Sequence, residues 1–368
     1  MPDSQLLADR AIAEEPAFDA HMDALQRAVD LEHDLGTRTP GHFDLVRARE
    51  GGLGAVVLVC WIDPATLPDG AADRARALIA AAHALEERHP EALLLVREAE
   101  DLSRSRQSGR IAGLIGIEGG HAIENDLRTL EEFATDGLRV MTLCWNNHLE
   151  WIRSCQPDAP AGTPDGLSDF GRDVVRKMNE LGVVVDLSHA SERALFDTLE
   201  VTNVPVIASH SGCTAVYDHR RNLSDDGLRA LADNGGVVGV VLHPGFLDAE
   251  ADADERRLRQ EDGYRALRQS NPTAQHLAQS EWMAERAAPL SVERWVDHVE
   301  HACEIAGPLH VGIGTDFDGI ERSVAGVPDA RGYRCLARAL FERGFDEATV
   351  RGVLGGNMQR VFAAALPR

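Results

Sequence analysis

Short runs of consecutive apolar residues recur along this chain, and few of them alternate with polar residues as a half-exposed strand would. Two clear cases are Val183–Val185 and Val204–Ala208, which a short amphipathic segment connects. Unbroken apolar runs joined by helices are typical of parallel strands that are buried on both faces. The pattern predicts eight strands, over Phe18–Met22, Gly54–Trp61, Ile111–Ile117, Leu138–Trp145, Val183–Val185, Val204–Ala208, Gly236–Leu242 and His310–Thr315.

Segments with helical periodicity alternate with these strands. Asp169–Leu181, for example, has Ser168 in the N-cap position and Gly182 just past its end. Further helices are expected over Ala71–Arg88, Leu127–Thr135, Ser191–Leu199, a segment that Ser224 caps, Val292–Ala306, Leu336–Arg343 and Asp346–Ala364. Eight parallel strands with outer helices predict an α/β fold, a (β/α)8 TIM-type barrel. The alternative, a doubly wound open sheet, would need a glycine-rich phosphate loop after its first strand, and no GxGxxG or Walker-type motif is present.

One segment interrupts this alternation. Residues 244–290 follow the seventh strand, are strongly charged and contain helix-forming pieces. They either form a lid that covers the mouth of the barrel or are a solvated surface insertion. We therefore expect a single domain over residues 1–368, with 244–290 as a helical excursion from it.

Composition narrows the range of partners. The formal net charge of −23 argues against nucleic acid and anionic membranes, which both require basic patches. The acidic N-terminus has no apolar leader, and no segment approaches the ~20 apolar residues of a spanning helix. The six cysteines form no CxxC pair, which fits a reducing compartment and predicts a cytoplasmic protein. The expected partner is a small molecule, and a homodimer remains open.

Histidines and acids stand at the ends of five of the eight predicted strands. They are His21 and Asp23, Glu118, His189, His210, and the pair Asp316 and Asp318. Each alone is compatible with a loop, a helix cap or a satisfied strand end. The carboxyl ends of barrel strands all meet at one rim, however, so their recurrence there favours a common site.

Three histidines and two carboxylates suit two zinc-like ions, with one carboxylate between them. Glu118 is the candidate for that bridging position, because the only lysine, Lys177, flanks the buried stripe of a predicted helix and is poorly placed for chemistry. Two such ions about 3.5–4 Å apart can hold a hydroxide that is nucleophilic near neutral pH. The pattern therefore predicts a metal-dependent hydrolase.

At these positions the chain resembles the membrane (renal) dipeptidase family of zinc peptidases, peptidase family M19, within the amidohydrolase-type barrels. The matching motifs occur in family order over nearly the whole chain: DAHMD at 19–23, IEGGH at 117–121, LRVMTLCWNN at 138–147, DLSHAS at 186–191, IASHS at 207–211, RRNLSDD at 220–226, GIGTDFDGI at 312–320 and GGNMQRVF at 355–362.

The resemblance implies a binuclear zinc dipeptidase. It assigns His21 and Asp23 to one ion, His189 and His210 to the other, and Glu118 to the bridge. It also implies that Arg221 holds the substrate carboxylate, a task that suits a planar guanidinium fork. Asp316 would bind the substrate amino group and carry the proton to the leaving amine, while Asp318 would orient Asp316 or a ligand.

The chain departs from the family pattern in two places. Ala20 and Met22 replace the usual Gly and Asn of the first motif, and neither is a ligand. Trp145 stands where mammalian members carry a histidine that is thought to polarise the scissile carbonyl. Asn146, His148 or a zinc ion would then stabilise the oxyanion.

Three functions follow from this sequence. The first is a two-zinc dipeptidase that uses a metal-bridging hydroxide and also accepts a C-terminal D-residue. The second is a hydrolase of N-acyl amino acids, other small amides or lactones, which Trp145 and the excursion motivate. The third is a barrel that binds a ligand without catalysis.

Overall fold

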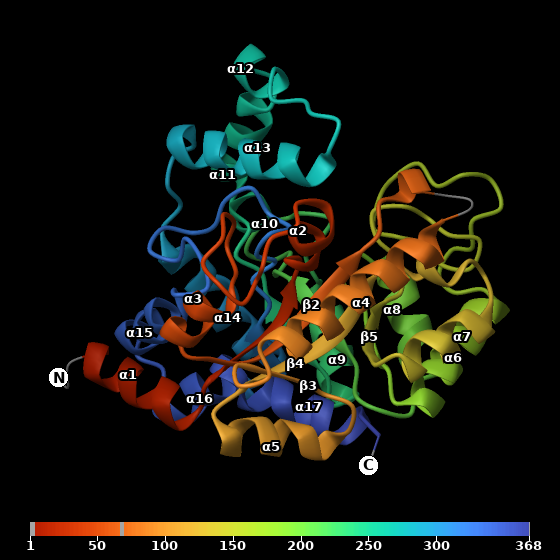
Figure 1. The fold of residues 1–368 in the computed structure, drawn as a ribbon, viewed down its shortest axis with the longest axis horizontal. Helices are drawn as coiled ribbons and strands as arrows, with labels where there is room; N and C mark the ends of the chain where they lie inside the picture. The colour runs from red at the N-terminus through yellow and green to blue at the C-terminus, as the bar shows by residue number, and fades with distance from the viewer. Residues whose placement is uncertain (1–3, 67–69, 368) are drawn as a thin grey trace.

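The computed structural model describes residues 4–66 and 70–367. Its strands run parallel in one sheet (Figure 1). Within the described residues they are β1 (Ala17–Met22), β2 (Leu53–Trp61), β3 (Leu93–Leu95), β4 (Ile111–Glu118), β5 (Leu138–Thr142), β6 (Val184–Asp186), β7 (Ile207–Ser211), β8 (Val237–Val240) and β9 (Val311–Ile313).

The sheet closes on itself. β1 pairs with both β2 and β9, and β2 also pairs with β4. The strands from β4 to β9 then follow in sequence order around the ring, while β3 pairs with β4 outside it. The eight ring strands with helices between them confirm the predicted (β/α)8 barrel.

The helices alternate with the strands and surround them. In the described residues they are α1 (Ser4–Glu14), α2 (Leu25–Asp30), α3 (Leu45–Gly51), α4 (Ala71–Arg88), α5 (Ala99–Ser108), α6 (Leu127–Thr135), α7 (Asp169–Leu181), α8 (Glu192–Leu199), α9 (Asp225–Asp233), α10 (Pro244–Leu247), α11 (Ala249–Leu258), α12 (Asp262–Arg265), α13 (Pro272–Arg286), α14 (Val292–Ala306), α15 (Tyr333–Arg343), α16 (Glu347–Arg351) and α17 (Asn357–Ala365). Short 3-10 turns at Pro64–Thr66, Gly120–Ile123 and Pro308–His310 and a π turn at Gly352–Gly356 complete the list.

The capping signals work as expected. Ser168 accepts a hydrogen bond from the backbone N–H of Gly171 at the start of α7, and Gly182 ends that helix with a φ of 66°. Ser224 caps α9 in the same way, by accepting from Gly227. The predicted boundaries of α4, α6, α7 and α14 agree with the structure.

Several features differ from the prediction. α1, α2 and α3 were not predicted, and β7 spans Ile207–Ser211 where a strand over Val204–Ala208 was expected. β3 and α5 were missed between α4 and β4, because a three-residue strand is too short for a pattern to show. β5 ends at Thr142, so residues 143–145 are rim loop and not strand. The last two strands, predicted over Gly236–Leu242 and His310–Thr315, are also shorter, since β8 and β9 span only Val237–Val240 and Val311–Ile313.

The helix expected over Asp346–Ala364 is divided into α16, the π turn and α17. Gly355 in this turn lies against the start of β1, where an added Cβ would stand 2.7 Å from the carbonyl oxygen of Pro16. Such close packing of backbone on backbone is one reason for a local change in helical geometry.

The excursion at 244–290 forms α10 to α13, and Figure 1 shows α11, α12 and α13 beyond one end of the barrel. The start of α13 is fixed to the end of α2. Asn271 Nδ2 donates to the backbone oxygen of Asp30 at 3.0 Å, and Thr273 Oγ1 donates to its carboxylate at 2.6 Å. Arg74 pairs with the same carboxylate at 2.7 Å. In the described part of the chain, no helix is both long and apolar enough to cross a membrane.

Candidate metal and substrate site

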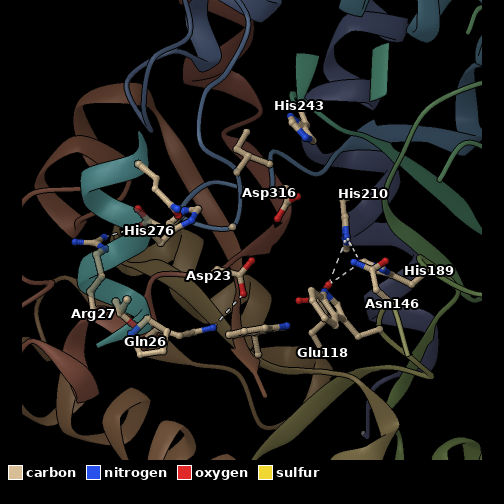
Figure 2. Close-up of a pocket in the computed structure, with 18 of the residues that line it drawn as sticks. Asp23, Gln26, Arg27, Glu118, Asn146, His189, His210, His243, His276 and Asp316 are labelled. Carbon is tan, nitrogen blue, oxygen red and sulfur yellow. Dashed lines mark hydrogen bonds and ion pairs between the residues drawn. The ribbon is translucent and has the colours of Figure 1, made fainter. Parts of the chain in front are cut away.

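The three histidines and two carboxylates predicted from the strand ends converge at one rim of the barrel. We call them the metal cluster: His21, Asp23, Glu118, His189 and His210. Figure 2 shows four of them, Asp23, Glu118, His189 and His210. All five are buried. Their donor atoms lie within 4.8 Å of one another in two groups, which share Glu118: one with His21 and Asp23, the other with His189 and His210.

Glu118 is at the centre of this cluster. Its Oε1 lies 2.9 Å from His189 Nε2, 3.5 Å from His210 Nε2 and 3.6 Å from His21 Nε2. On the other side of His21, Nε2 is 3.5 Å from Asp23 Oδ2. A carboxylate that faces both groups is suited to bridge two cations.

The outer nitrogens of the three imidazoles are held by hydrogen bonds. His189 Nδ1 lies 3.0 Å from Asn146 Oδ1. Ser209 Oγ lies 2.8 Å from His210 Nδ1 and 3.2 Å from His21 Nδ1. Since that hydroxyl donates to the carboxylate of Asp186 at 2.6 Å, it accepts from the imidazole nitrogens. His189 and His210, whose Nδ1 atoms donate in these bonds, are thereby left without a proton on the inner Nε2, which is the form that binds a metal.

The inner nitrogens provide a test of whether the cluster suits metal. His21 Nε2 is buried and has no hydrogen-bond partner. His189 Nε2 and His210 Nε2 approach each other to 3.0 Å. These buried nitrogens face one another, and they also face two carboxylates. Such an arrangement is costly in a protein unless a cation lies between the groups. The donor set therefore fits divalent metal.

The ionisation of the cluster follows from burial and mutual charge. Burial lowers the pKa of His189 to about 4, and Arg221 acts in the same direction. Burial also lowers the pKa of His210 well below its ordinary value. Burial acts against the charge on Glu118 as well, but His21 and His189 hold its pKa below the ordinary value. Burial opposes a proton on His21 too, yet Glu118 and Asp23 raise its pKa well above 6.5. The cluster thus favours positive charge at its centre.

The backbone at the site is strained. His189, Asp316 and Asp318 have positive φ values of 68°, 61° and 66°, which are unusual for residues other than glycine. Such strain often accompanies functional sites, because the surrounding structure must hold it in place.

Asp316 faces the cluster from the loop after β9. Its carboxylate lies within 4.8 Å of the donor nitrogens of His21 and His210, and its backbone N–H donates to the carbonyl oxygen of His21 at 3.2 Å. Burial raises the pKa of Asp316 well above 3.8. Gly319 makes room for it, since a Cβ there would stand 2.3 Å from Asp316 Oδ1 and 2.4 Å from Asp23 Oδ2.

Asp318 has a different environment from Asp316. It forms a buried ion pair with Arg27 at 2.6 Å and accepts from the backbone N–H of His42 at 2.7 Å. Its own N–H donates to His42 Nδ1 at 3.0 Å. These contacts hold the strained loop that carries Asp316.

Arg221 approaches the site from the loop after β7. It is 5% exposed, and its Nη2 donates to the backbone oxygen of His210 at 3.2 Å. Its Nε has no partner, and none of the carboxylates in residues 4–66 and 70–367 pairs with it. The guanidinium stacks over Phe246 at 5.3 Å. A buried cation without a counter-ion is a receptor for an anionic ligand.

One cavity of about 390 Å³ is lined by four residues of the metal cluster, all but His21, together with Arg221, Asp316 and Asp318. A model of the membrane dipeptidase family (peptidase family M19) matches residues 7–366. The chain belongs to this family.

Relatives agree with this assignment. Dipeptidase 3 of Mus musculus is 33% identical over 331 residues, which are 89% of this chain and 59% of the mouse protein. The chain therefore spans less than two thirds of that relative's length. The solved structure of the probable dipeptidase PvdM from Pseudomonas aeruginosa aligns with a TM-score of 0.84, 24% identity and 98% coverage of both chains. The structure of dipeptidase AC, a metallopeptidase of family M19, aligns with a TM-score of 0.79, 26% identity, and coverage of 96% of this chain and 99% of that one.

Trp145, which stands where the family resemblance led us to expect a histidine in mammalian members, lines the cavity. Its ring centroid is 5.3 Å from that of Trp61 and 6.2 Å from that of His189. Asn146 also lines the cavity, where it orients His189. His148 was expected to reach into the site, but it is not among the residues that line the cavity. Its Nδ1 accepts from the backbone N–H of Ser154 at 3.2 Å instead.

Sequence reasoning missed several residues of the site. Ser209 and Asp186, which orient two imidazoles, were not proposed, although both stand beside the predicted ligands in the motifs DLSH and IASH. The excursion residues His276 and Leu277, on α13, were also missed as lining residues. No local pattern signals them, since they reach the cavity only through the tertiary fold.

Proposed function

We propose that this chain is a dipeptidase that holds two zinc ions and hydrolyses the single peptide bond of dipeptides, including those with a C-terminal D-residue. The observation that carries the proposal is Arg221. It is a buried guanidinium with no acidic partner among the residues that the structure describes, and it lies beside a cluster suited to two divalent cations. A ligand with one free carboxylate and a scissile bond a few atoms away satisfies both features.

The metal cluster would hold the two ions, with His21 and Asp23 on one, His189 and His210 on the other, and Glu118 between them. Bound there, divalent cations would polarise the scissile carbonyl and lower the pKa of a coordinated water to about 7.

The residues of the chain bind and orient the substrate and move the proton. Arg221 pairs with the terminal carboxylate through its two parallel N–H groups. Asp316, on the loop after β9, holds the substrate ammonium at its carboxylate. The same carboxylate takes the proton of the attacking water and delivers it to the leaving amine. The cavity of about 390 Å³ is at the small end of ligand pockets, which suits a dipeptide better than a longer peptide.

Three further points belong to the proposal. The solved metallopeptidase from Rhodobacter sphaeroides, 24% identical to this chain with a TM-score of 0.78 and coverage of 95% of this chain and 99% of that one, carries a phosphinate mimic of L-Ala-D-Ala. A C-terminal D-residue is therefore part of the proposed substrate range. The cytoplasmic location and a homodimer remain predictions, the first of them supported by six free cysteines.

The test is a panel of L-L and L-D dipeptides, their amides and their N-acetyl derivatives, assayed with protein whose metal content has been measured. We expect about two zinc ions per chain and turnover only of substrates with both a free carboxylate and a free amino group. A fully loaded protein that cleaves no dipeptide would refute the proposal.

The second candidate, a hydrolase of N-acyl amino acids, is favoured by one observation. Trp61 and Trp145 present an aromatic wall to the cavity, which could receive an acyl group. The same panel separates the two functions. Faster turnover of N-acetylated substrates than of free dipeptides would establish the second one.

A further inference from the structure

The direction of a bound dipeptide follows from the two charged groups that would hold its ends. Arg221 lies beside His210, and Asp316 is connected to the end of β1 through its hydrogen bond to His21. On the proposed function, the C-terminal residue therefore lies toward β7 and the N-terminal residue toward β1 and β9.

The helix α13 stands on the N-terminal side of this arrangement. It is anchored to α2, which follows β1, through Asn271 and Thr273. His276 and Leu277 of α13 line the cavity. Figure 2 shows His276 reaching in beside Arg27, on the side of Asp23 and away from His189 and His210.

We propose that α13 forms the pocket for the side chain of the substrate's N-terminal residue, and that His276 makes this pocket select an uncharged polar side chain, above all the carboxamide of glutamine. This inference rests on the proposed function and adds the substrate class.

The charged residues on the α13 side of the cavity argue against a charged side chain on the substrate's N-terminal residue. Where α13 meets the cavity, Asp318 is the only described lining acid besides Asp23 and Asp316. It is paired with Arg27. Arg27 in turn donates to Thr39 at 2.8 Å and to the backbone oxygens of Pro40 and Phe43. Since both charges already have partners, neither a lysine nor a glutamate side chain would find an opposite charge there.

One polar group on the α13 side of the cavity lacks a partner among the described residues. His276 Nε2 is buried and makes no hydrogen bond among the described residues. Whether this nitrogen donates or accepts depends on the tautomer, and a carboxamide satisfies either case because it carries both a donor and an acceptor. Leu277 lines the cavity beside it, so the pocket also offers apolar contact to the methylene groups of the side chain.

The experiment compares two substrate series with the zinc-loaded protein: X-Ala, where X is Gln, Met, Lys or Glu, and Ala-Y with the same four residues as Y. We expect Gln-Ala to have the highest kcat/KM of its series. In His276→Ala the preference for Gln-Ala over Met-Ala should fall about fivefold, as expected for one hydrogen bond between uncharged groups. The order in the Ala-Y series should stay unchanged.

Two further variants separate selectivity from a general structural effect. Gln275→Ala changes the neighbouring residue of α13, which does not line the cavity, and should leave both series as in the wild type. His276→Gln keeps a donor and an acceptor and should restore most of the preference. A protein that hydrolyses dipeptides but whose preference for Gln-Ala over Met-Ala is the same in His276→Ala, or whose Ala-Y order changes instead, would overturn this inference alone. A loaded wild type that hydrolyses none of them would overturn the proposed function together with it.

Discussion

The role of Arg221 can be tested by removing its charge while keeping an unbranched apolar stem, in Arg221→Met. Hydrogen bonds to charged groups are worth about 1.5–3 kcal/mol each, so two parallel bonds to the substrate carboxylate are worth about 3–6 kcal/mol. At about 1.36 kcal/mol for each factor of ten, the loss in kcat/KM should be about 10² to 10⁴. Arg221→Lys keeps the charge without the fork, and should lose less.

The free energy of unfolding should change far less than the activity. Arg221 is a buried charge with no acidic partner, so its replacement removes a desolvation penalty. The contact with Phe246 that is lost is worth about 0.5–2 kcal/mol. The two effects offset each other, and we expect the free energy of unfolding to change by no more than about 1 kcal/mol.

The assay measures kcat/KM for a dipeptide and for its C-terminal amide, together with urea unfolding. The wild type and Arg221→Met should be equally poor on the amide, because the group that Arg221 binds is absent from it. Arg220→Met is the matched control. Arg220 is exposed and bonds to Gln156 at 2.9 Å, so its removal should leave kcat/KM unchanged. Equal losses in the two variants, or the same loss on dipeptide and amide, would refute the assignment of Arg221.

Three further predictions concern the site and its support. Removal of metal with a chelator should abolish activity and lower the melting temperature, with recovery on addition of zinc; activity that persists in metal-free protein would contradict the metal cluster. The Arg27 pair lowers the pKa of Asp318 below 3.8, although burial acts to raise it, so the stabilisation it provides is present above about pH 4 and is lost as the pH falls through the depressed value. Asp318→Asn should therefore be less stable than the wild type at pH 6, by about 3–5 kcal/mol for a broken buried pair. This difference in the free energy of unfolding should become smaller toward pH 3. Urea unfolding at both pH values measures it, and a difference that does not change with pH would contradict the prediction. Gly319→Ala would push the carboxylates of Asp316 and Asp23 aside and should lower kcat/KM about 10²-fold, while circular dichroism shows an intact fold; unchanged kinetics would mean that the two carboxylates need not be so close.

The ligand positions could be predicted from sequence because they follow a simple rule of the fold. A parallel barrel places the carboxyl end of every strand at one rim, so His21 and Glu118, nearly 100 positions apart in the chain, were expected to be neighbours. The structure places their Nε2 and Oε1 atoms 3.6 Å apart. The same rule cannot tell which of two acids in DFDG faces the cluster. That depended on the partners of Asp318, Arg27 and His42, which come from other loops.

His148 shows where the prediction of the site was too local. It was proposed, beside Asn146, as a group that stabilises the oxyanion, but it does not line the cavity, and its Nδ1 accepts a hydrogen bond from the backbone N–H of Ser154 instead. Loop direction depends on such contacts between residues that no periodicity connects.

The order of apolar runs and capping residues was sufficient to specify the parallel barrel, since each run must be buried on both faces and each helix must return the chain to the same end of the sheet. It also specified which side chains would meet at the rim. The protonation of the imidazoles, the absence of a counter-ion at Arg221 and the approach of His276 on α13 came from contacts between distant segments. Those contacts depend on packing in three dimensions, because burial and neighbouring charge, which set the chemistry of a side chain, are properties of its surroundings in the folded protein.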